Sequence, residues 1–155
     1  MTYQKNDLYV DHRNNTHLHL GCLGPYHVTY DGSYMNTFHV VSDAHKMSMW
    51  KKTTSKPSWV TNFHARAVQS VVPMKAGEVY KTSHHTAIVV ANEGPYLCMY
   101  NGLFLETFDA RVNLSVLKSY KRIPADDIWT HSSKELIAFM DRWGIHKEET
   151  ESVFG

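Results

Sequence analysis

The chain repeats itself at a spacing of 70 residues. Residues 24–38 read GPYHVTYDGSYMNTF and residues 94–108 read GPYLCMYNGLFLETF, so seven of the fifteen positions are identical. Average composition gives roughly one identity between two unrelated stretches of that length. The same spacing aligns four further pairs, namely Trp50 with Tyr120, Lys51 with Lys121, Lys52 with Arg122, and Trp59 with Trp129. We therefore predict an internal tandem duplication of about 70 residues.

The length of the repeat limits how its two copies can be arranged. A copy of about 70 residues buries a small share of its surface and is marginally stable alone. The connecting segment, VVPMKAGEVYK, is too short to let two modules move freely. We expect residues 1–75 to form the first repeat and residues 76–155 the second, packed together as one globular unit with pseudo-two-fold symmetry.

Strand signals dominate both copies. Asp31-Gly32 and Asn101-Gly102 are dipeptides that close two-residue hairpins of type I′. The residues that flank them are rich in aromatic and β-favouring types. Further strands are expected at residues 7–12, 16–21 and 46–52 of the first copy, and at residues 78–84, 86–91 and 116–122 of the second. Each copy is therefore predicted to be an antiparallel β-meander of four to five strands.

A helix is expected to close each copy. Residues 134–143, KELIAFMDRW, carry apolar side chains at helical spacing and follow Ser132 and Ser133, either of which can cap a helix. Residues 61–72, TNFHARAVQSVV, share this plan and end before a proline. Strands followed by a helix in both copies predict an α+β fold.

Composition excludes several classes of protein. With 43% hydrophobic and 20% charged residues, the chain is typical of a folded globular protein. A net charge of +1 provides no overall basic field, so nucleic-acid binding would require a local patch. The N-terminal residues lack the apolar core of a signal peptide, and no apolar stretch is long enough to span a membrane. We expect a cytoplasmic protein with no membrane partner.

Histidine distinguishes the two copies. The chain has 11 histidines. Four in the first copy align with other residue types in the second: His17 with Ala87, His19 with Val89, His27 with Leu97, and His39 with Asp109. If the hairpin is centred on Asp31-Gly32 and the preceding loop on Cys22-Leu23, then His17, His19 and His39 lie on one face of the sheet.

Three imidazoles on one face are a common way to bind a divalent metal such as zinc. One interpretation is therefore a metal site formed by His17, His19 and His39. The alternative is that the protein has no cofactor. In that case the histidines either bond to one another or lie on a face that the first copy exposes to solvent and the second copy buries.

The second copy carries a different histidine motif. The sequence His84-His85-Thr86 contains one His-x-Thr motif, which resembles the motif that the two-histidine phosphoesterases carry twice. The resemblance implies that His84 and Thr86 act on a phosphate ester, the histidine as acid or base and the hydroxyl as a ligand of the phosphate oxygens. The aligned residues 14–16 read Asn-Asn-Thr, so the first copy lacks the motif.

Basic and aromatic side chains alternate in aligned segments of both copies. The residues concerned are Trp50, Lys51 and Lys52 in the first copy, and Tyr120, Lys121 and Arg122 in the second. Cations beside stacking rings are typical of sites for single strands and nucleotides. We predict two related surfaces for an anionic or aromatic ligand. The alternative is that the large rings belong to the core.

Two classes of function are consistent with these features. The first is a noncatalytic binding or inhibitory protein whose pseudo-symmetric surface meets a protein, nucleotide or nucleic-acid partner. The second is a His-dependent hydrolase that acts on a phosphate ester, with or without metal, through His17, His19, His39, His84 and Thr86. Phosphate-binding loops, nucleophile elbows and paired zinc cysteines are absent from the sequence. We favour the binding protein, because catalysis requires several groups to converge.

Overall fold

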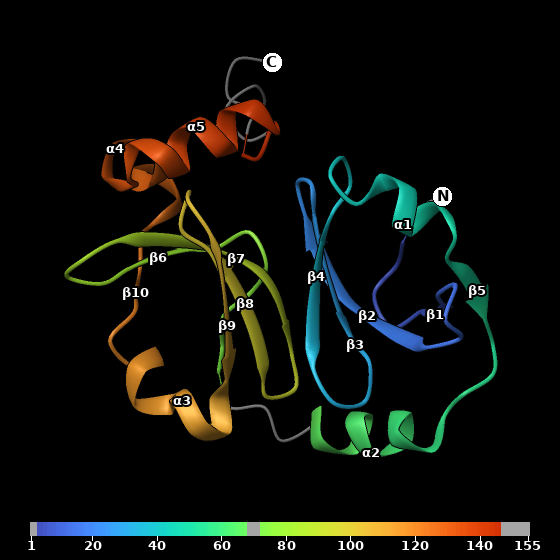
Figure 1. Cartoon of the computed structure of the whole chain (residues 1–155). Helices are drawn as coiled ribbons and strands as arrows, with labels where there is room; N and C mark the ends of the chain where they lie inside the picture. The colour runs from blue at the N-terminus through green and yellow to red at the C-terminus, as the bar shows by residue number, and fades with distance from the viewer. Residues whose placement is uncertain (1–2, 68–71, 147–155) are drawn as a thin grey trace.

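The computed structural model describes residues 3–67 and 72–146, which form two similar units, each built on a five-stranded antiparallel sheet (Figure 1). We call residues 3–67 the first unit and residues 72–146 the second unit. The sheet of the first unit has the order β4-β3-β2-β1-β5, with β1 at Leu8–Val10, β2 at Thr16–Leu23, β3 at Tyr26–Tyr30, β4 at Met35–His39 and β5 at Lys51–Thr53. The sheet of the second unit has the order β10-β6-β7-β8-β9, with β6 at Val79–Lys81, β7 at Thr86–Glu93, β8 at Tyr96–Tyr100, β9 at Leu105–Asp109 and β10 at Lys121–Arg122. The two orders are equivalent, and the predicted α+β class is confirmed.

The pairing register also agrees between the units. Every residue pair in the β2-β3 and β3-β4 ladders has a counterpart 70 residues later in the β7-β8 and β8-β9 ladders. An irregularity in the ladder recurs as well, between His19 and Gly21 in β2 and between Val89 and Ala91 in β7. Such a β-bulge inserts one residue, so that residues before and after it change the face to which they point.

The loops after β3 and β8 differ from the predicted two-residue turns. Tyr30 pairs with Met35, so Asp31 and Gly32 belong to a four-residue loop. A type I′ turn needs positive φ at both central residues, whereas here Gly32 has φ +99° and Asp31 does not have positive φ. The side chain of Asp31 instead accepts hydrogen bonds from two backbone N–H groups of the loop, at 2.9 and 2.8 Å. The prediction of a type I′ turn is therefore wrong.

The tight turn lies one hairpin earlier. Leu23 pairs with Tyr26 around Gly24-Pro25, and Gly24 has φ +55°. The predicted centre of this turn, Cys22-Leu23, is wrong by two residues. This position favours glycine, because glycine adopts positive φ without steric cost.

The prediction of full strands at residues 46–52 and 116–122 is also wrong. Two short helices occupy the first part of these segments, α1 at Ala44–Ser48 and α3 at Ala110–Leu117. The buried side chains here are three residues apart, Met47 with Trp50 and Leu117 with Tyr120. A spacing of three places both side chains on one side of a helical turn, whereas neighbours on one face of a strand are two apart.

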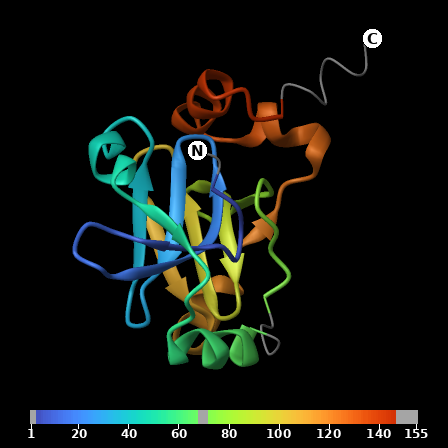
Figure 2. The ribbon, with the colours of Figure 1, turned by 90° about the vertical axis from the view of Figure 1, so that its right-hand side faces the viewer.

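The longer helices close the two ends of the sheet pair. The remaining helical segments are α2 at Ser58–Ala67, the 3₁₀ turn η1 at Ala125–Asp127, α4 at Ile128–His131 and α5 at Lys134–Arg142. Helices α2 and α5 lie at opposite ends in both views (Figures 1 and 2). Ser133 caps α5 by accepting a hydrogen bond from the backbone of Leu136 at 3.3 Å, as predicted. The predicted helix at 61–72 begins earlier, at Ser58, and part of its predicted end lies outside the described residues. Within the described residues, no helix is both long and apolar enough to cross a membrane.

One apolar core lies between the two sheets and draws on both units. From the first unit it includes Leu18, Leu20, Val28 and Tyr30, and from the second Ile88, Val90, Cys98 and Tyr100. Phe63 of α2 stacks on Tyr96 of the second unit, with ring centroids 5.7 Å apart, and meets Tyr30 of its own unit at 5.3 Å. The units therefore share their main core.

Phe139 of α5 makes the equivalent contacts from the other end. Its ring lies 5.8 Å from Tyr26 of the first unit and 4.5 Å from Tyr100 of its own. Phe63 and Phe139 are 76 residues apart in the chain, six more than the spacing of the strands. The second unit uses its extra residues for η1 and α4, which precede α5.

The helices therefore break the 70-residue alignment. A Cβ added at Gly32 would lie 3.0 Å from the ring of Trp59, and one added at Gly102 would lie 2.7 Å from the Cβ of Glu135. Trp59 and Glu135 thus occupy equivalent places against the two loops. The predicted pairing of Trp59 with Trp129 is not a structural equivalence, because Trp129 lies in α4.

The two units meet at equivalent residues of their central strands. Gly21 of β2 contacts Ala91 of β7, and these two residues are 70 positions apart. A residue that touches its own counterpart marks the axis of a two-fold arrangement. A Cβ at Gly21 would lie 3.0 Å from the Cβ of Ala91, so the strands cross here at the closest distance that glycine allows.

Candidate functional site

The outer faces of the two sheets have opposite chemistry. In the second unit this face is apolar and includes Ala87, Val89, Leu97 and Met99. The equivalent positions of the first unit hold His17, His19, His27 and Thr29, and all four are buried. We call these four residues the polar layer. Because they are buried, the alternative that the first unit exposes this face to solvent is wrong.

His17 lies at one end of the polar layer. Its Nε2 is 2.9 Å from Asp11 Oδ2, its Nδ1 is 3.1 Å from Thr29 Oγ1, and its ring stacks on Trp50 at 5.0 Å. Burial alone would raise the pKa of Asp11, but the hydrogen bonds from His17 and from the backbone of Asn15 and Arg13 lower it. Both ring nitrogens of His17 are therefore engaged within the protein, which leaves neither one for a substrate proton or a metal.

His19, His27 and Cys22 converge at the other end of this layer. His19 Nε2 is 2.9 Å from His27 Nδ1, and the Sγ of Cys22 lies within 4.8 Å of a ring nitrogen of each histidine. Cys22 pairs with His27 across the ladder, so it faces the same side as His27. Burial, together with the neighbouring His27, lowers the pKa of His19 to about 4. Burial likewise lowers the pKa of His27 and raises that of Cys22, so the unliganded cluster is uncharged at neutral pH.

His39 lies on the opposite face, so the predicted cluster of His17, His19 and His39 does not form. His39 pairs with Tyr26, and its ring meets the rings of Tyr26 at 5.2 Å and of Trp143 at 5.9 Å. The cause is the β-bulge in β2. It inserts one residue between the histidines of β2 and the turn, which moves His17 and His19 away from the face of Tyr26.

His84 and Thr86 do not converge on one site. Thr86 is buried, and its Oγ1 accepts a hydrogen bond from the backbone of Ser133 at 2.8 Å, immediately before α5. His84 is exposed and lies in the loop before β7, at a pocket that Thr86 does not line. The hydroxyl therefore supports a helix start, and His84 shares the pocket lining with His85 instead.

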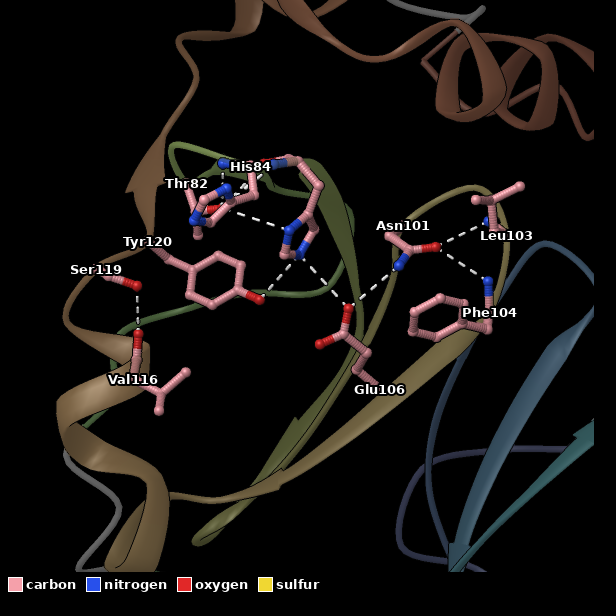
Figure 3. Close-up of polar contacts among 10 residues, drawn as sticks. Thr82, His84, Asn101, Leu103, Phe104, Glu106, Val116, Ser119 and Tyr120 are labelled. Carbon is pink, nitrogen blue, oxygen red and sulfur yellow. Dashed lines mark hydrogen bonds and ion pairs between the residues drawn. The ribbon is translucent and has the colours of Figure 1, made fainter.

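That pocket, in the second unit, has a volume of about 730 Å³ and lies between the 82–85 loop, the end of α3 and β10 (Figure 3). We call it the second-unit pocket. His85 Nε2 is 3.2 Å from Tyr120 Oη and 3.5 Å from Glu106 Oε1, and Asn101 donates to the same carboxylate at 3.2 Å. Glu106 is the one carboxylate among its lining residues, and both of these contacts are made to its Oε1.

Two lysines stand at the edge of the second-unit pocket. Lys81 of β6 pairs directly with Lys121 of β10 in the ladder, and both are exposed. Neither forms an ion pair with any other described residue. Like charges that face each other across two strands repel, so this edge is electropositive.

The first unit has a pocket at the equivalent place, with a volume of about 330 Å³. We call it the first-unit pocket. Seven of its lining residues are aligned, at a spacing of 70, with lining residues of the second-unit pocket. The pairs, first unit before second, are Asp11 with Lys81, His12 with Thr82, Arg13 with Ser83, Asn15 with His85, Asn36 with Glu106, Lys46 with Val116, and Trp50 with Tyr120. In the first-unit pocket Arg13 and Lys46 are balanced by Asp11 and Asp31, whereas the second-unit pocket has two lysines and one carboxylate.

The six residues of the predicted ligand surface do not form one surface, because they differ in burial and in contacts. Trp50 and Tyr120 are 2% and 8% exposed. Each ring is part of the buried cluster on the outer face of its own sheet, which agrees with the alternative that the large rings belong to the core. The two cations that follow them, Lys52 and Arg122, pair with Asp7 at 3.3 Å and with Glu78 at 3.1 Å. Lys51 and Lys121 remain exposed, and Lys121 alone of the six predicted residues combines exposure with a place in a pocket.

Sequence reasoning missed the roles of His27, His85 and Asp11. His27 is one of the divergent positions, and placing the turn at Gly24-Pro25 would have put it beside Cys22. His85 replaces Asn15 at an aligned position, a difference that the comparison of the copies contains. No local pattern marks Asp11, because its contact with His17 depends on how β1 and β2 pair.

The two regions have different chemical capacities. The second-unit pocket offers cations and hydroxyl groups, which suit an anion. The cluster of His19, His27 and Cys22 offers two imidazoles and a thiol, which suit a metal ion. The chain matches no protein-family model, no curated protein and no solved structure.

Proposed function

We propose that this protein is a noncatalytic binding protein that holds a phosphate-bearing small molecule in the second-unit pocket. The observation that carries the proposal is the pair Lys81 and Lys121, which face each other across β6 and β10 at the pocket edge. Like charges in that position destabilise a sheet, by up to about 1 kcal/mol. A bound anion removes this repulsion and gains two charge-assisted contacts.

The lining defines what kind of ligand fits. Ser83 and His84 are exposed at the same edge as the two lysines and supply further donors. Tyr120 is buried and meets the His85 ring edge to face at 5.8 Å, so its ring does not offer an open stacking surface. A nucleotide would therefore bind through its phosphate end rather than by stacking of its base.

Binding without catalysis agrees with the engagement of His85, one of the two histidines that line the pocket. A histidine that acts as general acid or base presents a ring nitrogen within hydrogen-bond reach of the reacting atom. His85 instead has Tyr120 and Glu106 at its Nε2 and Thr82 at its Nδ1, the last at 3.4 Å. The alternative function, a His-dependent phosphate-ester hydrolase, predicts turnover of the ligand, and the experiment below measures it.

In this proposal two sequence repeats, residues 1–75 and 76–155, arose by internal tandem duplication and gave rise to the two units. The equal strand order, the common register and the recurring β-bulge support that origin. After duplication the copies diverged: the second-unit pocket has Lys81 where the first unit has Asp11, and the outer layer of the first unit has histidines where the second has apolar residues. The pseudo-symmetric surface then became two different binding regions in a cytoplasmic protein.

The test uses phenyl phosphate as the probe, at low ionic strength. Titration calorimetry and amide chemical shifts should detect binding, with the largest shifts in residues 82–85 and 119–121. The double variant Lys81→Gln/Lys121→Gln should raise the Kd by about tenfold, the loss of roughly 1.4 kcal/mol that two exposed phosphate contacts provide. It should also flatten the salt dependence of binding.

The matched control is Lys46→Gln/Lys51→Gln, which removes the same charge from the equivalent region of the first unit. It should leave the Kd within about twofold of the wild-type value. An equal loss in both double variants would mean that the chain attracts anions only through its net charge. Absence of binding at low salt would reject the proposal, and release of phenol would favour the hydrolase.

A further inference from the structure

We infer that the first unit holds a zinc ion between His19, His27 and Cys22, at a site separate from the pocket of the proposed function. Each residue offers one ligand atom, a ring nitrogen from either histidine and the Sγ of Cys22, and these three atoms lie within 4.8 Å of one another. Both nitrogens come from buried rings, whereas Cys22 is exposed. Imidazole and thiolate are the ligands that zinc prefers in proteins.

The spacing of the three atoms suits a tetrahedral ion. Zinc binds nitrogen at about 2.0–2.1 Å and sulfur at about 2.3 Å, which separates tetrahedral ligand atoms by roughly 3.3–3.6 Å. The nitrogens of His19 and His27 are now 2.9 Å apart and share a hydrogen bond. A small rotation of either ring opens this distance to the required value. As the ion binds, the shared hydrogen moves by tautomerisation to the outer nitrogen of its own ring, so both rings stay neutral.

The proton balance of binding follows from the two rings. His19 must carry its hydrogen on Nδ1 and His27 on Nε2, so that the two facing nitrogens both present lone pairs. Nδ1 of His19 is buried beside the backbone of Gln4, toward which it can direct that hydrogen. Cys22 binds as a thiolate, so each zinc ion displaces one proton from the thiol.

The second unit shows that packing alone does not require these side chains. The equivalent positions there hold Val89, Asn92 and Leu97 on the same backbone. Asn92 donates to the backbone carbonyls of Val72 and Met74, at 3.0 and 2.6 Å, and so fixes the segment that precedes β6. A thiol is a poor donor, so Cys22 does not take over this role in the first unit.

The β-bulge creates the site. Residues three apart on a regular strand point to opposite faces, but the extra residue in β2 brings His19 and Cys22 to the same face. His27 reaches them from the neighbouring strand, where it pairs with Cys22. His17 contributes nothing, because Asp11 and Thr29 occupy both of its nitrogens.

A cavity gives access to this metal site from between the units. Its volume is about 360 Å³, and it is lined by His19 and Cys22 from the first unit and by Met74 and Asn92 from the second. Three protein ligands with an open fourth position are typical of zinc sites that retain a water or bind an external ligand. The site assigned here therefore has room for such a fourth ligand.

The test is a titration of the reduced, chelator-treated full chain with Co²⁺, followed by displacement with Zn²⁺. Binding of one equivalent should produce the visible bands of tetrahedral cobalt and a near-ultraviolet band from the thiolate. The variants take their replacements from the second unit, His19→Val/His27→Leu and Cys22→Asn, which the same backbone accommodates. Each should weaken binding by more than the roughly 10–100-fold that loss of an outer-shell partner causes.

The matched control is His39→Asp. Asp109 occupies the equivalent position and accepts a backbone hydrogen bond from Arg111, just as His39 Nδ1 accepts one from Val41. This variant should bind cobalt like the wild type, and circular dichroism should show all variants folded. Loss of the thiolate band in His39→Asp, or its persistence in Cys22→Asn, would overturn the site. Binding of Cu⁺ without Zn²⁺ or Co²⁺ would overturn the zinc assignment.

Discussion

The first and second units have the same backbone plan and different outer layers. Their ladders agree pair for pair at a spacing of 70 residues, and both central strands carry the same bulge. Yet His17, His19, His27 and Thr29 of the first unit stand where the second unit has Ala87, Val89, Leu97 and Met99. The difference teaches that turns and the inner face define the architecture, while the outer face can change from apolar to polar without changing the ladder.

One hydrogen bond in the hairpin loops is kept in both units although the residues that make it differ. In the first unit Asn36 Nδ2 donates to Asp31 Oδ2 at 3.2 Å, and in the second unit Asn101 Nδ2 donates to Glu106 Oε1 at 3.2 Å. The donor and the acceptor have exchanged positions between the strand and the loop. The geometry of the bond is kept although each residue has changed, which indicates that the loop requires the contact rather than a particular side chain.

The largest effect is expected from the two equivalent phenylalanines. Phe63→Ala and Phe139→Ala each remove a ring that bridges the units, and each should lower the free energy of unfolding by about 3–5 kcal/mol. Because the core is shared, both variants should shift one cooperative transition, measured by denaturant titration with fluorescence and circular dichroism. Two separate transitions, each moved by one variant, would show that the units unfold independently.

The contact on the pseudo-two-fold axis should give the next largest effect. Gly21→Ala places a Cβ 3.0 Å from that of Ala91 and should destabilise the protein by about 1–3 kcal/mol. Adding Ala91→Gly to it exchanges the two residues across the axis and should recover most of that loss. A double-mutant cycle measures the recovery, and simple additivity of the two effects would contradict the close approach.

Replacing the buried pair His19 and His27 by the equivalent residues of the second unit should change the free energy of unfolding less, and should raise it rather than lower it. In the presence of a chelator, His19→Val/His27→Leu should raise the free energy of unfolding by about 1 kcal/mol, because both partners of a buried hydrogen bond leave together. Free zinc at a hundred times its Kd should stabilise only the wild type, by about 2.7 kcal/mol. A variant that is less stable with chelator would show that packing requires the histidines.

The smallest effect concerns acid stability. Burial alone would raise the pKa of Asp31, but hydrogen bonds from the backbone of Tyr34 and Ser33 and from Asn36 lower it below its ordinary value of 3.8. The stabilisation from this carboxylate is therefore present above about pH 4 and is lost as the pH falls through the lowered pKa. The second unit makes the same loop bonds with Asn101, which does not titrate.

Asp31→Asn should accordingly flatten the fall of the melting temperature between about pH 5 and pH 2. At neutral pH it should be slightly less stable than the wild type, because a charged acceptor is replaced by a neutral one. Thermal unfolding at several pH values measures both differences. An unchanged slope would mean that other groups account for the acid sensitivity of the first unit.

The sequence was sufficient for features that depend on neighbours along the chain. The repeat at 70 residues predicted two similar units, and the apolar pattern after Ser133 predicted α5 with its cap. The alignment of His17, His19 and His27 with apolar residues located the layer in which the units differ. These features follow from local spacing and composition, which the order of residues states directly.

The grouping of side chains into sites depended on contacts between distant strands. The β-bulge in β2 decided that His27 and Cys22, rather than His39, join His19, because one inserted residue reverses the face of everything beyond it. Helix α1 formed where a strand was predicted at residues 46–52, and the turn at its end brings Met47 and Trp50, three residues apart, into the same buried layer. The lysines at the second-unit pocket meet because β10 pairs with β6, a contact between residues 40 positions apart. Register and strand pairing are set by the balance of packing over the whole sheet, and no short stretch of sequence contains that balance.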